Sequence, residues 1–283
     1  MAQRTELGGL WAAVLIPRNA AGDVDEKAFR GTLEFLGARG VHRVVLNGAT
    51  GEYCLTTEDE LSRLLNVCRG TEFLCAIGAA GVRGSIRLGK LALDAGARAL
   101  VLPMPHFFPY AQGDLIEYCE RVAGELDAPI LLYNLPRFTT PLERSTVQAL
   151  LERVPNIVGI KDSSGSLEIL SALQPEKACR IVGDDRVLAS ALAAGACDGV
   201  ISGVAGVLPE LMQLVYSGRD PSAPGKLEEL IVKLSVFPTP WGLKLVAEAR
   251  GLGPAHFAQS LSPIRQKQVE EFRTWFASGA ASL

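Results

Sequence analysis

Eight short apolar runs recur along this chain, and each is followed by a longer segment of helical periodicity. The runs, rich in leucine or β-branched residues, begin near Leu10, Val41, Phe73, Ala99, Ile130, Ile157, Arg180 and Gly199. Eight alternations of strand and helix are what a closed parallel barrel requires. We therefore predict an α/β protein with a (β/α)8 TIM-barrel fold over residues 1–224. A doubly wound open sheet is the alternative, but it would not need eight evenly spaced strands.

Local signals mark the ends of several predicted helices. Thr57 and Glu60 have the spacing of a capping box at the start of a helix, and Gly70 is expected to close it. Pro209 and Gly218 are placed to start and stop a later helix. These signals divide the chain into the short units that a barrel needs.

The strand pattern ends near residue 219, and the rest of the chain has helical segments only. Val269, Phe272 and Phe276 lie at positions i, i+3 and i+7, which gives the last helix one apolar face. We predict that residues 225–283 form a C-terminal helical extension packed on the barrel.

Composition excludes several classes of protein. The 283 residues are 48% apolar and 21% charged, as in a globular protein with a sizeable core. A net charge of −3 gives no basic field for nucleic acid, and no segment suggests a membrane span or a membrane surface. Six scattered cysteines without a CxxC pair indicate reduced thiols and a cytoplasmic protein, and three distant histidines give no metal site.

The apolar run at 157–160 ends in a lysine, Lys161. By strand alternation Ile157, Gly159 and Lys161 share one face, and Gly159 leaves space beside the lysine. If that face is the barrel interior, Lys161 is partly removed from water, which disfavours the ammonium form. A neutral amine can attack a ketone to form a Schiff base. The alternative is a lysine that extends from the strand end into water.

Tyr133 ends the preceding apolar run, at 130–132. Adjacent strands lie about 4.8 Å apart, so Tyr133 and Lys161 are able to reach one another. A tyrosine beside an imine-forming lysine can relay protons for carbinolamine dehydration and carbon–carbon bond chemistry. The alternative is a core tyrosine whose hydroxyl bonds to the barrel wall. The presence of both residues at neighbouring strand ends favours the catalytic interpretation.

A glycine-flanked turn follows the run at 44–46. Gly48 and Gly51 surround Ala49 and Thr50. Such a turn leaves backbone N–H groups exposed and suited to a small carboxylate, and the Thr50 hydroxyl adds a donor. The alternative is an ordinary glycine turn before a helix.

Three motifs therefore occur in order at predicted strand ends, namely Gly48-Ala49-Thr50-Gly51-Glu52, Tyr133-Asn134-Leu135-Pro136 and Gly159-Ile160-Lys161-Asp162. Together they resemble the dihydrodipicolinate synthase/N-acetylneuraminate lyase family. The likeness extends along the chain to Gly183-Asp184-Asp185 and Gly199-Val200-Ile201-Ser202. It implies a class I, Schiff-base-forming lyase on a (β/α)8 barrel with a C-terminal helical extension.

The resemblance also implies a role for each matching residue. Lys161 is similar to the imine-forming lysine and Tyr133 to the general acid/base. Ala49 and Thr50 occupy the positions whose backbone amides, with the threonine hydroxyl, hold the carboxylate of pyruvate. Ile201 resembles the residue whose backbone carbonyl lies near that pocket. The covalent Schiff base on Lys161 implies that no cofactor and no metal are needed.

Three positions depart from the synthase pattern. Ala49 lacks the hydroxyl of the usual motif, and Phe107 stands where a neighbouring subunit would donate a tyrosine to a proton relay. Phe138 stands where the synthase has an arginine for the carboxylate of aspartate semialdehyde, with Arg137 just before it. A lost carboxylate clamp weakens the binding of a charged partner. Whether Arg137 substitutes is left open, and the aromatic loop has subunit packing or a lid as alternative roles.

We therefore expect an aldolase, or an aldolase-like dehydratase, that cleaves or forms a 2-oxo acid with pyruvate as donor. The expected substrate is a 2-keto-3-deoxy sugar acid or, because of the aromatic residues near Phe107 and Phe138, an aromatic 2-oxo acid. The alternatives are a 4-hydroxy-tetrahydrodipicolinate synthase, which condenses pyruvate with aspartate semialdehyde, and a non-catalytic barrel that binds a 2-oxo acid. The resemblance implies a homo-oligomer, a tetramer or a dimer, with a small-molecule substrate as its partner.

Overall fold

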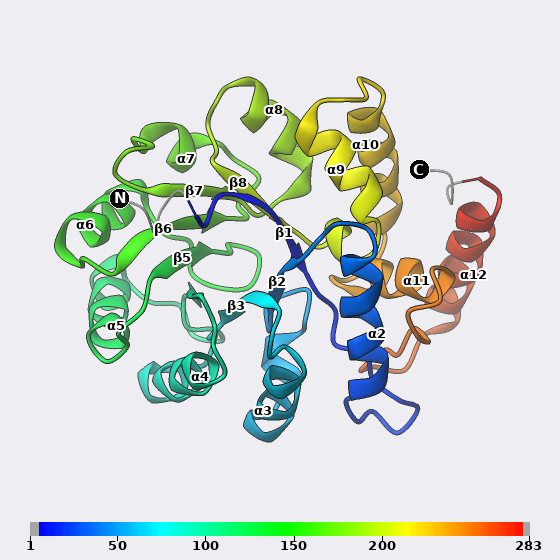
Figure 1. Cartoon of the computed structure of the whole chain (residues 1–283), viewed down its shortest axis with the longest axis horizontal. Coiled ribbons are helices and arrows are strands. Elements are labelled where there is room, and N and C mark those ends of the chain that lie inside the picture. The colour runs from blue at the N-terminus through cyan, green and yellow to red at the C-terminus, as the bar shows by residue number, and fades with distance from the viewer. Residues whose placement is uncertain (1–5, 280–283) are drawn as a thin grey trace.

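The strands of the computed structural model close into one parallel barrel in chain order, as the sequence predicts. The structure describes residues 6–279 (Figure 1). The strands are β1 (Gly9–Ala13), β2 (Arg43–Leu46), β3 (Glu72–Ala76), β4 (Ala99–Pro103), β5 (Ile130–Asn134), β6 (Ile157–Asp162), β7 (Cys179–Val182) and β8 (Gly199–Ser202). Closure comes from β1 pairing with both β2 and β8.

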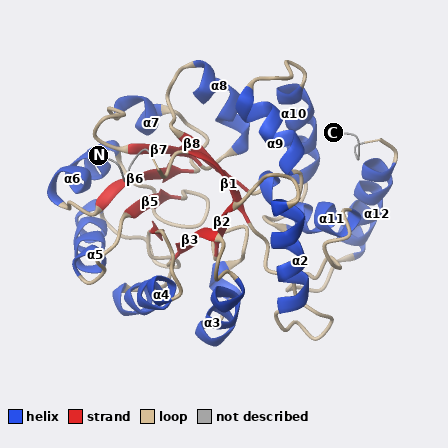
Figure 2. Cartoon of the chain, in the orientation of Figure 1, coloured by secondary structure: helices blue, strands red, loops and turns tan. Residues whose placement is uncertain are grey.

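Helices follow the strands and form an outer ring around them, which Figure 2 shows as blue around red. The ring contains α2 (Glu26–Gly37), α3 (Glu58–Val67), α4 (Val82–Asp94), α5 (Gln112–Gly124), α6 (Arg144–Arg153), α7 (Glu168–Ala172), α8 (Leu188–Ala193) and α9 (Pro209–Ser217). Three short 3₁₀ turns lie among them, η1 (Tyr53–Leu55), η2 (Asp185–Val187) and η3 (Val204–Gly206).

The local start signals are confirmed in α3 and α9, and the stop signal is confirmed in α9. The Glu60 amide donates to Thr57 Oγ1 at 3.2 Å, and the Thr57 amide donates to the Glu60 carboxylate at 2.9 Å. This capping box satisfies amides that the first helical turn leaves free. Pro209 is the first residue of α9, and Gly218 ends it with φ of 65°. Helix α3 ends at Val67, somewhat before Gly70.

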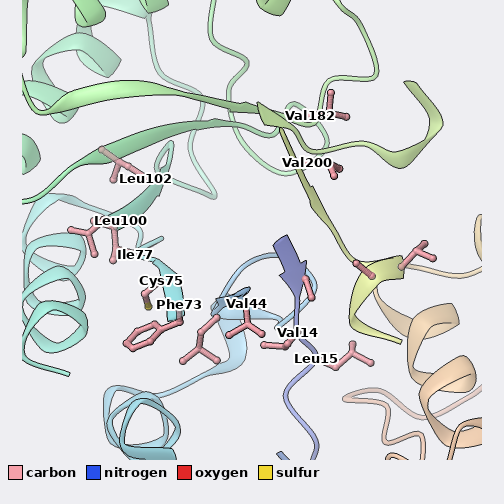
Figure 3. Close-up of a cluster of buried hydrophobic side chains, with 14 of the residues drawn as sticks. Val14, Leu15, Val44, Phe73, Cys75, Ile77, Leu100, Leu102, Val182 and Val200 are labelled. Atoms are coloured by element: carbon pink, nitrogen blue, oxygen red, sulfur yellow. The ribbon is translucent and has the colours of Figure 1, made fainter. Parts of the chain in front are cut away.

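Strand alternation separates two apolar layers. One layer lies between the strands and the helices, and Figure 3 shows part of it. Its members include Val44, Phe73, Cys75, Leu100, Leu102 and Val182. The other layer fills the barrel interior and includes Trp11, Val45, Leu74, Val101, Leu131 and Ile181. A strand residue next to an outward-facing one therefore points into the barrel.

The predicted alternation along β6 is wrong in one respect. Ile130 of β5 pairs with Ile157, whereas Leu131 pairs with Gly159, so Val158 is an extra residue in β6. Ile157 packs in the outer layer and Val158 in the barrel interior. Ile157 and Lys161 therefore do not share a face, because this bulge shifts the alternation between them.

Three further helices follow the barrel, as predicted, and the described residues after β8 contain no strand. They are α10 (Ala223–Leu234), α11 (Trp241–Ala249) and α12 (Pro263–Ala277), and they lie together at one side of the barrel (Figure 1). Val269, Phe272 and Phe276 are buried, as their spacing predicts. The division after residue 224 stays a prediction. Among the described helices, none has the length and apolarity to cross a membrane.

Candidate active site

Tyr133 and Lys161 are direct neighbours at the carboxyl ends of β5 and β6. They are register partners, and both are buried. The Lys161 Nζ lies 4.0 Å from the centroid of the Tyr133 ring. Tyr133 belongs to the interior layer, and Ile160, just before Lys161, belongs to the outer layer. The amine and the phenol therefore meet inside the mouth of the barrel, where TIM-barrel active sites lie.

A cavity of about 210 Å³ opens at this point. The sequence-predicted residues that line it are Ala49, Thr50, Tyr133, Arg137, Phe138, Lys161 and Ile201. Gly48 and Phe107, the other predicted binding residues, are not among the lining residues. A concave site with a buried lysine and convergent polar groups fits a small-molecule substrate.

The turn formed by residues 47–52 places Ala49 and Thr50 at the cavity. Their backbone amides donate no hydrogen bond to any other described residue. Asn47 and Glu52, at the two ends of the turn, have left-handed backbones with φ of 59° and 52°. The Asn47 Nδ2 group donates to the Ala76 carbonyl at 2.9 Å. Free N–H groups in a tight turn are suited to an anion.

The glycine that makes room for Lys161 is Gly183, whereas the sequence pointed to Gly159. A Cβ on Gly183 would lie 2.7 Å from the Lys161 Cε and 2.2 Å from the Ser163 Oγ. A Cβ on Gly159 would instead meet the backbone oxygen of Cys179 at 2.1 Å. Gly183 therefore lets the β7 strand end approach the lysine, and Ser163 donates to the Gly183 carbonyl at 2.9 Å. The sequence pointed to Gly159 because alternation considers one strand alone, whereas pairing between strands decides which atoms face a glycine.

Asp185 is a second ionisable group in the cavity wall. Ser202 donates to its Oδ2 at 2.9 Å and accepts from the Ala205 amide, which fixes the direction of the serine hydrogen. The Oδ1 atom is buried and has no hydrogen-bond partner in the described part of the chain. Burial raises the pKa of Asp185 to about 6, opposed by the Ser202 hydrogen bond.

Two guanidinium groups stand at the outer part of the cavity. Arg186 pairs with Asp184 through both carboxylate oxygens. Burial acts to raise the pKa of Asp184, but the hydrogen bonds and charge of Arg186, with the charge of Arg137, lower it below its usual value. Arg137 is exposed and forms no ion pair with another described residue. It is therefore free to bind an anionic group of a substrate.

The C-terminal helices complete the cavity, which the sequence did not predict. We call this surface the helical wall, formed by Ile231, Leu234, Phe237, Pro238, Pro240 and Leu243 with Ser235, Thr239 and Gly242 between them. The strand-side wall holds both polar and apolar residues, namely Ala49, Thr50, Tyr133, Leu135, Arg137, Phe138, Lys161, Ser163, Gly183, Asp184, Asp185, Arg186, Ile201, Gly203 and Val204. The helical wall carries no charged side chain. Helices distant in sequence reach the site only through tertiary packing, so no local pattern could have revealed them.

Phe107 lies at the surface in a conformation unusual for its type. Its side chain is 85% exposed and its φ is 85°. It packs edge-to-face on Phe108, which is 58% exposed. This exposed apolar pair, in which Phe107 has a left-handed backbone, is not explained by packing within the described chain.

A family model described as the dihydrodipicolinate synthetase family matches residues 6–277. The chain is 30% identical to a 4-hydroxy-tetrahydrodipicolinate synthase of Salinibacter ruber, covering 93% of this chain and 94% of that protein. It is 29% identical to one of Methanothrix thermoacetophila, with 94% of each covered. A solved dihydrodipicolinate synthase of Acinetobacter baumannii in complex with pyruvate is similar with a TM-score of 0.85 and 26% identity, covering 95% of this chain and 97% of that one.

Proposed function

Because the chain belongs to the dihydrodipicolinate synthetase family, whose members are class I aldolases and lyases, we propose that it forms a Schiff base between Lys161 and a 2-oxo acid. Pyruvate is the proposed donor or product. The observation that carries this proposal is the Lys161 amine 4.0 Å from the Tyr133 ring centroid, in a cavity bordered by the free amides of Ala49 and Thr50. The pyruvate complex of the Acinetobacter baumannii protein supports the choice of donor.

The proposed reaction begins with attack by the Lys161 amine on the keto carbon. Tyr133 donates a proton to the carbonyl oxygen, takes one from the attached nitrogen, and passes that proton to the carbinolamine hydroxyl, which leaves as water. The resulting iminium withdraws electrons from the neighbouring carbon, so a carbon–carbon bond there breaks or forms through an enamine. Ala49 and Thr50 hold the substrate carboxylate, and the Ile201 carbonyl faces the same pocket. No bound cofactor or metal enters this sequence.

The strand-side wall favours a hydroxylated acid over an aromatic one. Beyond Lys161 it presents Ser163, Asp185 and two arginines, which match hydroxyl and carboxylate groups. We therefore propose a 2-keto-3-deoxy sugar acid as the substrate class. The aromatic side chains at the cavity are those of Tyr133 and Phe138 and, in the helical wall, Phe237. Aldol cleavage and dehydration both use the same iminium.

A second candidate is the condensation of pyruvate with aspartate semialdehyde. Arg137 favours it, because an unpaired guanidinium in the cavity wall is able to hold the semialdehyde carboxylate. The names of the Salinibacter ruber and Methanothrix thermoacetophila relatives agree with this activity. A coupled assay with aspartate semialdehyde separates the two candidates, and Arg137→Ala should abolish the second while only weakening the first.

The Schiff base is tested by incubating the protein with pyruvate and borohydride, followed by mass spectrometry. We expect a reduced pyruvate adduct on Lys161 and on no other lysine. An unmodified Lys161 in folded protein would refute the proposal. Pyruvate binding without an adduct, and without turnover of any 2-oxo acid, would instead indicate a non-catalytic binding barrel. A panel of sugar-derived and aromatic 2-oxo acids in the cleavage direction identifies the substrate.

We propose that the protein works in the cytoplasm as a homo-oligomer, a tetramer or a dimer. All six cysteines are free in the structure, as expected of a reducing compartment. The exposed Phe107 and Phe108, and the exposed Leu55 of η1, provide apolar surface for a second copy. Phe107 cannot pass a proton, so activity should not depend on a hydroxyl from another subunit. Sedimentation velocity of the wild type and of Phe107→Asp measures this association.

A further inference from the structure

The far end of the 47–52 turn is anchored by a side chain from the C-terminal helices. Glu52, with its left-handed backbone, pairs with Lys244 of α11, and Nζ lies 2.6 Å from Oε2. The Lys244 and Glu52 side chains are only 7% and 11% exposed. Nζ also donates to the His256 carbonyl at 2.7 Å. A left-handed non-glycine residue persists only where its surroundings hold it, and this buried pair supplies that restraint.

The restraint acts close to the free amides at the cavity. The Glu52 amide donates to the Ala49 carbonyl at 3.0 Å, so the orientation of Glu52 is coupled to the peptide unit beside Thr50. Asn47 anchors the near end of the turn to β3 through its hydrogen bond to Ala76. The turn is therefore held to the sheet at one end and to α11 at the other.

Helix α11 contributes to the cavity as well as to the anchor. Leu243, just before Lys244, is part of the helical wall. A Cβ on Gly203 would lie 2.8 Å from Leu243 Cδ1 and 3.0 Å from Thr50 Oγ1, so this glycine allows helix and turn to approach closely. A shift of α11 would thus move the helical wall and the turn together.

We propose that Lys244 is a positioning residue for the substrate carboxylate. Through Glu52 it holds the 47–52 turn with the amides of Ala49 and Thr50 directed at the cavity, although Lys244 does not line that cavity. This inference rests on the proposed function, because it requires the turn to bind a carboxylate. Its signature is a defect specific to substrates that carry one.

The experiment compares the wild type with Lys244→Met by borohydride trapping on Lys161 over a range of pyruvate concentrations. We expect the half-saturating pyruvate concentration to rise about tenfold, because small displacements of binding groups weaken substrate binding. The fraction trapped at saturation should stay within about twofold of the wild type. Acetone has the ketone but no carboxylate, so Lys244→Met should trap it as fast as the wild type does. Lys244→Arg keeps the charge and should restore most of the pyruvate affinity.

Arg180→Met is the matched control, because it breaks a buried ion pair at the other end of the barrel. Arg180 bonds to Asp198 at 2.8 Å with 9% of its side chain exposed. This variant should lose stability and keep the wild-type response to pyruvate. Circular dichroism establishes that each variant is folded. If Lys244→Met does not fold, the nearly isosteric Glu52→Gln replaces it, with a smaller shift expected for pyruvate alone.

The inference is overturned if the folded variant binds pyruvate as the wild type does, or if acetone and pyruvate are affected equally. It is also overturned if the double variant Glu52→Gln/Lys244→Met regains wild-type affinity, since repulsion by an unpaired Glu52 would then explain the single variant. Failure of the wild type itself to trap pyruvate would refute the proposed function instead.

Discussion

The two walls of the cavity differ in origin and in chemistry. The strand-side wall comes from strand ends and the turns after them, and it holds every charged group of the site. The helical wall comes from α10, α11 and the segment between them, and its side chains are apolar or hydroxyl-bearing. Under the proposed function, bond making would depend on the strand-side wall, whereas the helical wall would shape the space for the rest of the substrate.

The sharpest test of this comparison removes the amine. Lys161→Ala should abolish borohydride trapping and reduce turnover by a factor of about 10⁴ or more, because no other group can form the imine. The variant should remain folded by circular dichroism. Turnover close to the wild-type rate would show that the chemistry does not depend on the amine in the strand-side wall.

Loss of the phenol hydroxyl should have the next largest effect. Tyr133→Phe keeps the ring beside Lys161 but cannot donate or accept a proton. We expect turnover to fall by a factor of about 10²–10⁴, with slower but detectable trapping of pyruvate. Stopped-flow measurement of imine formation separates the two steps. Full activity in this variant would exclude Tyr133 as the acid/base.

A bulky group in the helical wall should affect substrate choice and leave imine formation unchanged. Ser235 is exposed at the cavity mouth, so Ser235→Trp can be accommodated without disturbing the core. We expect pyruvate trapping to stay within about twofold of the wild type, while kcat/KM for the longest accepted 2-oxo acid falls about tenfold. Equal losses for both would contradict the division of roles between the walls.

The smallest expected effect is a pH dependence that belongs to the strand-side wall alone. Burial raises the pKa of Asp185 from 3.8 to about 6, so its stabilising contribution is present below about pH 4 and is lost as pH rises through about 6. Asp185→Asn should therefore gain stability relative to the wild type, by about 1–3 kcal/mol, between about pH 4 and pH 7. Urea unfolding at both pH values measures this gain.

Asp184→Asn is the control of opposite sign. Hydrogen bonds from Arg186 outweigh burial and lower the pKa of Asp184, so its contribution is present at neutral pH and is lost in acid. The variant should be less stable than the wild type at pH 7 and approach it as the pH falls. If the stability of both variants relative to the wild type changed in the same direction with pH, the pKa of one of the two carboxyl groups would be shifted in the direction opposite to that expected.

The order of the elements was predictable because the signals that specify them are local. Alternation of apolar runs located all eight strands, and the Thr57 capping box and Pro209 located helix starts. The meeting of Tyr133 with Lys161 was also predictable, since neighbouring strands in a barrel end side by side. Their catalytic and binding roles, like those of Ala49 and Thr50, stay predictions.

The features that escaped prediction depend on residues distant in sequence. The contact of Gly183 with Lys161, the helical wall and the Glu52–Lys244 pair each join segments that no single window contains. The extra residue in β6 is visible only once its pairing with β5 is known. Periodicity describes one strand at a time and carries no information about register.

The register between β5 and β6 decides which way the nucleophile points. With Ile157 facing the helices, uninterrupted alternation over residues 157–161 would turn Lys161 outward as well, and the bulge at Val158 prevents this. A deletion of Val158 would leave Leu131 opposite Gly159 and Tyr133 opposite Lys161, so the amine would still face the barrel interior. A β6 of unchanged length without the bulge would instead keep every proposed catalytic residue in the chain and direct the amine into the hydrocarbon packing outside the barrel.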